Sequence, residues 1–267
     1  MAVKAVYFSP TGTTAKIVLG IAGVLAGNGG AGVERVDFTL PGARQQPAAF
    51  SADDIVVFGV PVYAGRVPNV LLKYLNSLIG NGARAVAVVV YGNRNYDDAL
   101  VELTDILTSA GFGVVAGGAF IGEHAFSKTL AQGRPDDEDM AVAKGFAGRL
   151  AAKIAAGKAG NAAVKGNRPY RKYYMPGNAD GQPVDIRKVT PKTAVSCTGC
   201  GLCAAKCPMG SIKAEDVSQI NGICIKCGAC VKNCPVQAKY YDDPDYLRHK
   251  RELERDFAHR REPELFL

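Results

Sequence analysis

The chain has 267 residues, eight cysteines and a formal net charge of +7. Hydrophobic residues make up 48% of it, which is enough for a sizeable core and excludes a disordered protein. No apolar run approaches the roughly 20 residues that would span a bilayer. Residues 1–10 also lack the charged-then-apolar pattern of a secretory leader. We therefore expect a cytoplasmic protein with no membrane span.

The charges and the cysteines are unevenly distributed along the chain. Residues 1–160 carry 14 Lys and Arg against 13 Asp and Glu, whereas residues 161–267 carry 18 against 12. All eight cysteines lie between positions 197 and 234. This segregation predicts two domains of different chemistry joined end to end.

The first 157 residues alternate between strand and helix patterns, and we expect them to form one domain. Strands are predicted from apolar runs at residues 3–8, 33–38, 54–60, 84–91 and 113–122. Helices are predicted from apolar residues at helical spacing at residues 13–26, 68–78, 97–110 and 142–154. Alternating strands and helices predict an α/β fold, a doubly wound five-stranded parallel sheet with helices on both faces.

The remaining residues divide into three segments. Residues 158–190 are rich in Gly, Pro, Asn and basic residues and predict a linker. Within it, residues 167–175 interleave basic and aromatic side chains, a pattern that suits RNA or an acidic partner but is better interpreted as a linker docking on its own protein. Residues 191–243 contain the cysteines, and residues 244–267 predict a charged helical tail whose end packs on the protein body.

The cysteines form two matching runs of the pattern C-x2-C-x2-C-x3-C-P, offset by 27 residues. In such runs three thiolates hold one [4Fe–4S] cluster and the fourth, before proline, ligates the other. The spacing therefore predicts two clusters. One has the ligands Cys197, Cys200, Cys203 and Cys234, and the other has the ligands Cys224, Cys227, Cys230 and Cys207.

Three other interpretations of the cysteines are weaker. Disulfides are rare in the cytosol, structural zinc normally uses two separated Cys pairs, and a chance match would have to occur twice. A zinc-stapled binding module therefore remains the least favoured class.

Residues 191–243 resemble the bacterial two-cluster ferredoxins, with both motifs complete. Two clusters would also offset much of the positive charge of this half, so we expect no nucleic-acid partner.

A possible phosphate-binding loop joins the first predicted strand to the first predicted helix. Residues 9–14 read Ser-Pro-Thr-Gly-Thr-Thr, and a turn of this kind presents backbone N–H groups at the positive end of a helix. The loop lacks the lysine of nucleotide-triphosphate loops, and an ordinary Ser/Thr helix cap is the alternative. The candidate phosphate contacts are Ser9, Thr11, Gly12, Thr13 and Thr14.

The turn resembles the flavodoxin phosphate loop, S/T-x-T-G-x-T. Residues 59–68 and 91–97 follow two further strands and resemble the loops that enclose the isoalloxazine ring of FMN in flavodoxins. The resemblance covers residues 1–157 and implies that FMN is bound by Pro61, Val62, Tyr63, Ala64, Gly65, Tyr91, Gly92, Asn93, Arg94 and Tyr96. The chain has no Trp, so Tyr63, Tyr91 or Tyr96 is the expected stacking residue, and Tyr63 and Tyr96 are favoured because they lie within the loops. Arg66 and Arg94 predict positive charge near the ring, where many flavodoxins are acidic.

Together these features resemble the flavodoxin–ferredoxin fusion family. The resemblance implies an electron-transfer protein that passes electrons between FMN, two [4Fe–4S] clusters and redox partner proteins. The alternative is an FMN-dependent reductase of a small molecule, such as a quinone or nitro compound, that is fed through the clusters. All eight cysteines are needed as ligands, so we assign no catalytic residue. The donor, the acceptor and the oligomeric state stay open at this point.

Overall fold

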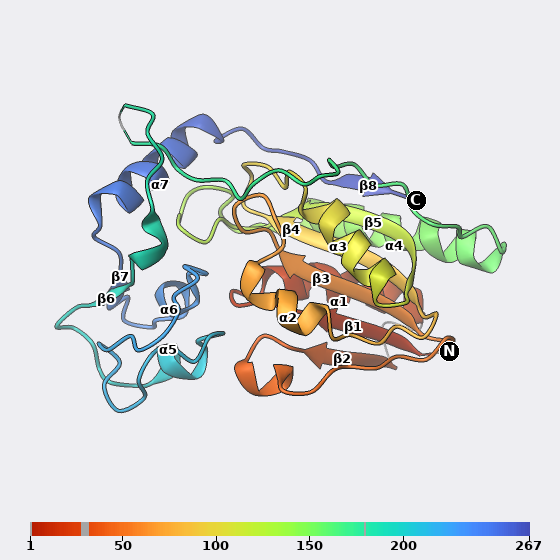
Figure 1. Cartoon of the computed structure of the whole chain (residues 1–267), viewed down its shortest axis with the longest axis horizontal. Coiled ribbons are helices and arrows are strands. Elements are labelled where there is room, and N and C mark those ends of the chain that lie inside the picture. Colours follow the sequence, from red (N-terminus) through yellow and green to blue (C-terminus); the bar gives the residue numbers. More distant parts are fainter. Residues whose placement is uncertain (1, 28–31, 179) are drawn as a thin grey trace.

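A computed structural model describes residues 2–27, 32–178 and 180–267. Figure 1 shows a larger part with a sheet flanked by helices, and a smaller part that contains the cysteine region. None of the helices within the described residues is long and apolar enough to cross a bilayer.

Five parallel strands form the larger part in the order β2-β1-β3-β4-β5, and their bounds are β1 (Val3–Tyr7), β2 (Val33–Asp37), β3 (Ile55–Pro61), β4 (Arg84–Tyr91) and β5 (Gly113–Ile121). This is the strand order of the flavodoxin-like doubly wound fold, which confirms the predicted fold class. The central strands β3 and β4 are apolar along nearly their whole length because helices cover both faces of the sheet.

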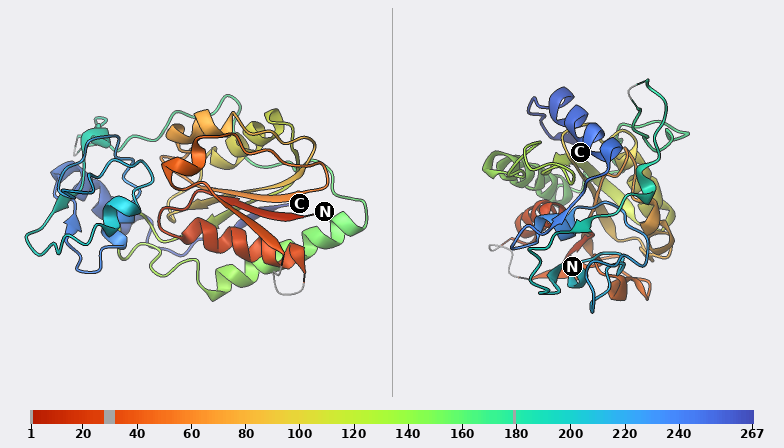
Figure 2. Two further views of the ribbon diagram at one scale, coloured as in Figure 1. Left: turned by 90° about the horizontal axis from the view of Figure 1, so that it is seen from below. Right: turned by 90° about the vertical axis from the view of Figure 1, so that its left-hand side faces the viewer.

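Helices pack on the two faces of the sheet, as Figure 2 shows edge-on. Helices α1 (Thr13–Ala26) and α4 (Asp137–Ala155) cover one face, where Ile17, Ile21 and Phe146 are buried. Helices α2 (Leu72–Leu75) and α3 (Ala99–Ser109) cover the other face, where Leu75 and Leu103 are buried. Asp136, the residue before α4, and Asp139 in its first turn form a capping box at the N-terminus of this helix.

The helix expected over residues 68–78 is much shorter in the structure. A 3-10 turn (Asn69–Leu71) precedes the four residues of α2, and the chain leaves the helix at Asn76. The hydroxyl of Ser77 donates a hydrogen bond to the carbonyl of Tyr74 (2.7 Å). Asn and Ser side chains compete for backbone groups in this way and end helices.

A sixth strand, β8 (Glu264–Phe266), pairs antiparallel with β5 at the edge of the sheet. The tail was expected to pack on the protein body, and it does so by extending the sheet. The rest of the tail is largely α7 (Pro244–Asp256). The pairing joins segments that lie far apart in the sequence, so local patterns carry no sign of it.

The smaller part contains two short strands and two short helices. Strands β6 (Lys192–Thr193) and β7 (Lys239–Tyr240) pair antiparallel, and the helices are α5 (Leu202–Ala205) and α6 (Ala229–Lys232). A glycine in left-handed conformation precedes each helix, Gly201 (φ 73°) before α5 and Gly228 (φ 74°) before α6. These two glycines are 27 residues apart, so the backbone repeats with the cysteine motif.

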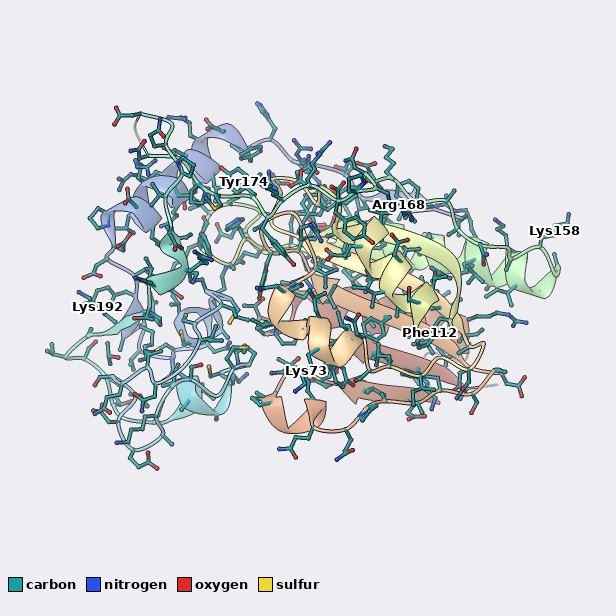
Figure 3. The ribbon with its side chains drawn as sticks, in the orientation of Figure 1. Lys73, Phe112, Lys158, Arg168, Tyr174 and Lys192 are labelled. Atoms are coloured by element: carbon teal, nitrogen blue, oxygen red, sulfur yellow. The ribbon has the colours of Figure 1, made fainter. Side chains whose placement is uncertain are left out.

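The segment after α4 runs back along the larger part towards the cysteine region (Figure 1) and contains a 3-10 turn, Ile186–Lys188. Asp98 accepts hydrogen bonds from the backbone N–H groups of Asn167 (2.9 Å) and Arg171 (2.7 Å). The guanidinium of Arg168, labelled in Figure 3, pairs with Asp105 of α3. The basic and aromatic residues of this segment therefore dock on the chain itself.

Candidate functional site

A cavity of about 520 Å³ lies between the two parts of the molecule. Its wall includes residues that follow β1, β3, β4 and β5, all at the carboxyl ends of parallel strands. Ligands of open α/β sheets bind at this edge, and the volume is typical of small-molecule sites. Residues 173–176 and 184–187 of the linker and residues 223–227 of the second cysteine run complete the wall.

The loop after β1 supplies one end of the cavity. Thr11, Thr13 and Thr14 line it, and Gly12 adopts φ +86°, which favours glycine. The first turn of α1 leaves the N–H groups of Thr13 and Thr14 without an intrahelical acceptor. Ser9 does not line the cavity, because its hydroxyl accepts a hydrogen bond from the N–H of Ala15 (3.0 Å) and caps the helix. The arrangement fits a phosphate group.

The loop after β3 presents Tyr63 to the cavity. Tyr63 and Arg66 exchange backbone hydrogen bonds of 3.0 and 3.1 Å, so the intervening residues form a tight turn. Ala64 (φ 52°) and Gly65 (φ 78°) are both left-handed in it. Pro61, Val62 and Ala64 also line the cavity, whereas Gly65 lies behind them, where a Cβ atom would collide with Asp97.

The loop after β4 divides its predicted contacts between the cavity and the protein interior. Tyr91, Gly92 and Arg94 line the cavity. The Asn93 side chain instead donates to the carbonyl oxygens of Phe257 (2.6 Å) and His259 (2.8 Å) in the tail.

Tyr96 is buried behind the same loop. Its ring centre lies 5.6 Å from that of Tyr91, and burial together with a hydrogen bond to Glu264 raises its pKa. Of the three candidate stacking residues, Tyr63 and Tyr91 therefore line the cavity and Tyr96 does not, so of the two favoured ones only Tyr63 does.

The two arginines of these loops have different surroundings. Arg66 forms a two-fold ion pair with the buried carboxylate of Glu102, with both distances 2.7 Å, and its charge is directed away from the cavity. Arg94 lines the cavity, pairs with Asp97, and stacks 4.5 Å from the ring centre of Tyr174. Of the two arginines, only Arg94 therefore places its charge at the cavity.

Several residues of the wall were not identified from the sequence. Tyr174, labelled in Figure 3, comes from the linker, and its N–H donates to the carbonyl of Ala64 (2.9 Å). His124 follows β5, and its Nδ1 accepts the N–H of Phe126 (3.1 Å). Burial lowers the pKa of His124 to about 3, so it is neutral with its proton on Nε2. The basic–aromatic pattern of residues 167–175 was the one local sign that the linker contacts a site.

His249 is a further wall residue, contributed by α7. Its imidazole is buried, and its ring centre lies 5.7 Å from that of Tyr174. Burial lowers the pKa of His249, which favours the neutral ring. The nearest carboxylate oxygen, on Glu252, lies 3.9 Å from its Nδ1.

Four cysteines from both runs line a second, smaller cavity: Cys207, Cys224, Cys227 and Cys230. Burial raises the pKa of the Cys227 and Cys230 thiols to about 12. Among the described residues, no three His, Cys, Asp or Glu side chains are close enough to hold a single metal ion. The ligands of a [4Fe–4S] cluster bind four different iron atoms and lie farther apart than the ligands of one ion.

The fourth cysteine of each run accepts a hydrogen bond from the backbone four residues later. The N–H of Ser211 lies 3.4 Å from Cys207 Sγ, and the N–H of Ala238 lies 3.2 Å from Cys234 Sγ. Left-handed residues also recur at the 27-residue offset, as at Gly199 (φ 67°) and Lys226 (φ 54°). Thiolate donors with backbone N–H groups nearby fit iron–sulfur clusters.

The two cavities share part of their walls. Cys224 and Cys227 line the larger cavity as well as the smaller one. Tyr63 lines the larger cavity together with both cysteines, and burial raises its pKa. The arrangement brings the flavodoxin-type loops and the second cysteine run into direct proximity.

A domain family described as "4Fe-4S dicluster domain" matches residues 196–239. No curated protein matches the chain. Among solved structures, a flavodoxin from the domain Archaea is 17% identical with a TM-score of 0.40 and covers 58% of this chain and 99% of its own. A flavodoxin of Streptococcus pneumonia TIGR4 is 21% identical with a TM-score of 0.40 and covers 57% of this chain and 99% of its own.

The fold of the larger part is assigned from its strand order, β2-β1-β3-β4-β5, which is that of flavodoxin. The iron–sulfur nature of the smaller part follows from the domain match and from the two cysteine runs. The chain thus joins a flavodoxin-type domain to a C-terminal 4Fe-4S dicluster domain, and it has the architecture of a flavodoxin–ferredoxin fusion.

Proposed function

We propose that the chain is an electron-transfer protein that binds FMN in the larger cavity and two [4Fe–4S] clusters in the cysteine region. The observation that carries the proposal is the shared wall, in which Cys224 and Cys227 border the cavity of the flavin loops. FMN exchanges two electrons and can release them singly, whereas each cluster carries one. Placing both cofactors in one chain replaces a diffusional encounter by an intramolecular one.

We name the two proposed ligand sets by their position. The inner set is Cys207, Cys224, Cys227 and Cys230, whose side chains line the smaller cavity next to the flavin loops. The outer set is Cys197, Cys200, Cys203 and Cys234, and its Cys200 is exposed to solvent. Under this proposal the outer set is the nearer one to an external redox partner protein.

The residues around the larger cavity have distinct roles in the proposal. Thr11, Thr13 and Thr14 hold the phosphate with their hydroxyls and the free N–H groups of α1. Tyr63 stacks on the ring. Arg94 provides the positive charge, which its ion pair with Asp97 holds in place.

Anaerobic reconstitution of the full chain tests the proposal. We expect about eight irons and eight sulfides per chain, since each [4Fe–4S] cluster contains four of each, together with one FMN released on denaturation. A colourless protein, or one that retains zinc instead of iron, would contradict it. Rapid turnover of a quinone or nitro compound with no partner protein present would instead support the reductase alternative.

A further inference from the structure

The two cysteine runs repeat in sequence but differ in their relation to the larger cavity. Residues 223–227, which include Cys224 and Cys227, form part of its wall. Cys200, the counterpart of Cys227 in the first run, is exposed to solvent. The second run therefore borders the larger cavity, and the equivalent residues of the first run do not.

Contacts with the loop after β5 hold the second run against the flavodoxin-type domain. At Gly228 a Cβ atom would come within 2.5 Å of the carbonyl oxygen of Ala125. Lys232 forms an ion pair with Glu123 and donates to the carbonyl of Ser127 (2.9 Å). Gly228, the residue before α6, and the side chain of Lys232, its last residue, thus lie against this loop.

The counterpart of Gly228 in the first run lacks such a neighbour. Gly201 has nearly the same φ (73° against 74°), but a Cβ atom there would meet nothing within 4 Å. An alanine at either glycine would cause the same backbone strain, and at Gly228 it would also disturb the contact between the domains. The two positions form a natural matched pair.

The wall segment has little apolar packing of its own to keep its shape. The hydrophobic cluster of the smaller part is built around Cys203, Ile212, Val217 and Cys230, so two of its buried members are proposed cluster ligands. Lys226 adopts φ 54°, a conformation that costs a non-glycine residue free energy. Ligation by one cluster would fix this segment at two points, Cys224 and Cys227, and α6 after it at a third, Cys230.

We propose that the cluster held by the inner set completes the flavin site, so that FMN affinity depends on that cluster and not on the one held by the outer set. The proposal rests on the proposed function, since it requires that both cofactors bind. FMN binds most tightly to the state in which the wall is ordered, and the cluster raises the population of that state. Because such coupling is reciprocal, bound FMN also raises the affinity of the inner set for its cluster by the same factor.

Matched cysteine variants provide the first test. Cys227→Ala and Cys200→Ala each remove one ligand at equivalent positions of the repeat. In anaerobically reconstituted full-length protein, we expect Cys227→Ala to raise the dissociation constant of FMN by about tenfold or more, and Cys200→Ala by less than about threefold. FMN titration followed by flavin fluorescence, with iron counted for each variant, provides the measurement.

Matched glycine variants provide a second test that keeps all eight cysteines. Gly228→Ala displaces the second run from Ala125, whereas Gly201→Ala leaves the contact intact. We expect both to keep the iron content of the unmodified protein, and Gly228→Ala alone to weaken FMN binding, by about fivefold or more. Because both clusters remain bound, this pair tests whether the contact of Gly228 with Ala125 carries the coupling between the inner set and the flavin site.

The possible results separate the two proposals. If the unmodified chain binds no FMN or no iron, the proposed function fails. If it binds both and Cys227→Ala and Cys200→Ala bind FMN with equal affinity, the proposed function stands and the dependence on the inner cluster is overturned. Weaker FMN binding in Cys227→Ala and Gly228→Ala, with normal binding in their partners, supports it.

Discussion

The side-chain nitrogen of Asn93 donates a hydrogen bond to the carbonyl oxygen of Phe257, and the two atoms lie 2.6 Å apart. The same nitrogen lies 2.8 Å from the carbonyl oxygen of His259, and the Asn93 oxygen accepts the N–H of Arg261 (3.2 Å). One buried side chain thus joins the loop after β4 to the segment between α7 and β8. Asn93 therefore holds the tail against the loop after β4 through three hydrogen bonds.

Replacing Asn93 by alanine should destabilise the protein. The substitution leaves two carbonyl groups and one N–H group of the tail without their partner, and such losses cost about 1–3 kcal/mol. Urea unfolding measures the free energy of unfolding. Gln46→Ala, at an exposed position of the same domain, is the control and should leave it unchanged. Equal stability of the two variants would show that the tail is held by other contacts.

Most of the larger part was predictable because its signals are local. The strand Arg84–Tyr91 and the helix Thr13–Ala26 have the bounds that their apolar patterns predict. The strand is buried along nearly its whole length, the helix is buried on a regular period, and turn residues mark their ends. The cysteine runs were equally plain, since their spacing repeats in full.

The features that escaped prediction depend on contacts between distant segments. His124 and His249 lie 125 positions apart, yet both line the cavity because α7 packs across the loop after β5. Likewise, Asn93 and Tyr96 belong to a flavin-type loop, but the tail engages their side chains. A local pattern identifies a loop, but it does not determine which of its side chains face the ligand.

Replacing Tyr63 by leucine should weaken FMN binding. An aromatic pair contributes about 0.5–1.5 kcal/mol beyond its buried area, so the dissociation constant should rise by about 2–12-fold. Tyr96→Phe is the comparison, because its hydroxyl contacts Glu264 away from the cavity. It should leave FMN affinity unchanged. A larger effect at Tyr96 than at Tyr63 would reverse the assignment of the stacking residue.

Replacing Arg94 by alanine should make the two-electron potential of bound FMN more negative. A cation near the ring stabilises its anionic reduced form. If the substitution removes about 1.4 kcal/mol of this stabilisation, the two-electron potential falls by roughly 30 mV. Redox titration measures the shift. Arg84→Ala removes the same charge at the opposite end of β4 and should leave the potential in place. An unchanged potential in Arg94→Ala would mean that Asp97 already cancels its charge.

Stability should fall on mild acidification because of His124. Burial lowers its pKa to about 3 in the folded chain, and electrostatic repulsion from His249 when it is protonated, from Lys232 and from Arg94 adds to the effect. An unfolded histidine has a pKa of about 6.5, so the unfolded state binds more protons below that pH. The contribution of neutral His124 to the free energy of unfolding is therefore complete above pH 6.5 and is lost as the pH falls towards 3.

Urea unfolding at pH 7 and pH 5.5 tests this dependence. His124→Gln should lose less stability between the two pH values than the unmodified chain, by on the order of 1 kcal/mol. His259 is exposed, and His259→Gln should retain the original dependence. Parallel curves for His124→Gln and the unmodified chain would refute the assignment.

The pairing of β8 with β5 has a consequence for how the protein is made. Glu264–Phe266 follow β5 in the chain only after the linker, the cysteine region and α7. On the ribosome, the flavodoxin-type sheet therefore emerges with one unprotected border, which is open to association with other chains until the later segments are translated. Separate expression of the first domain would leave that border open permanently, so the two halves should be produced together.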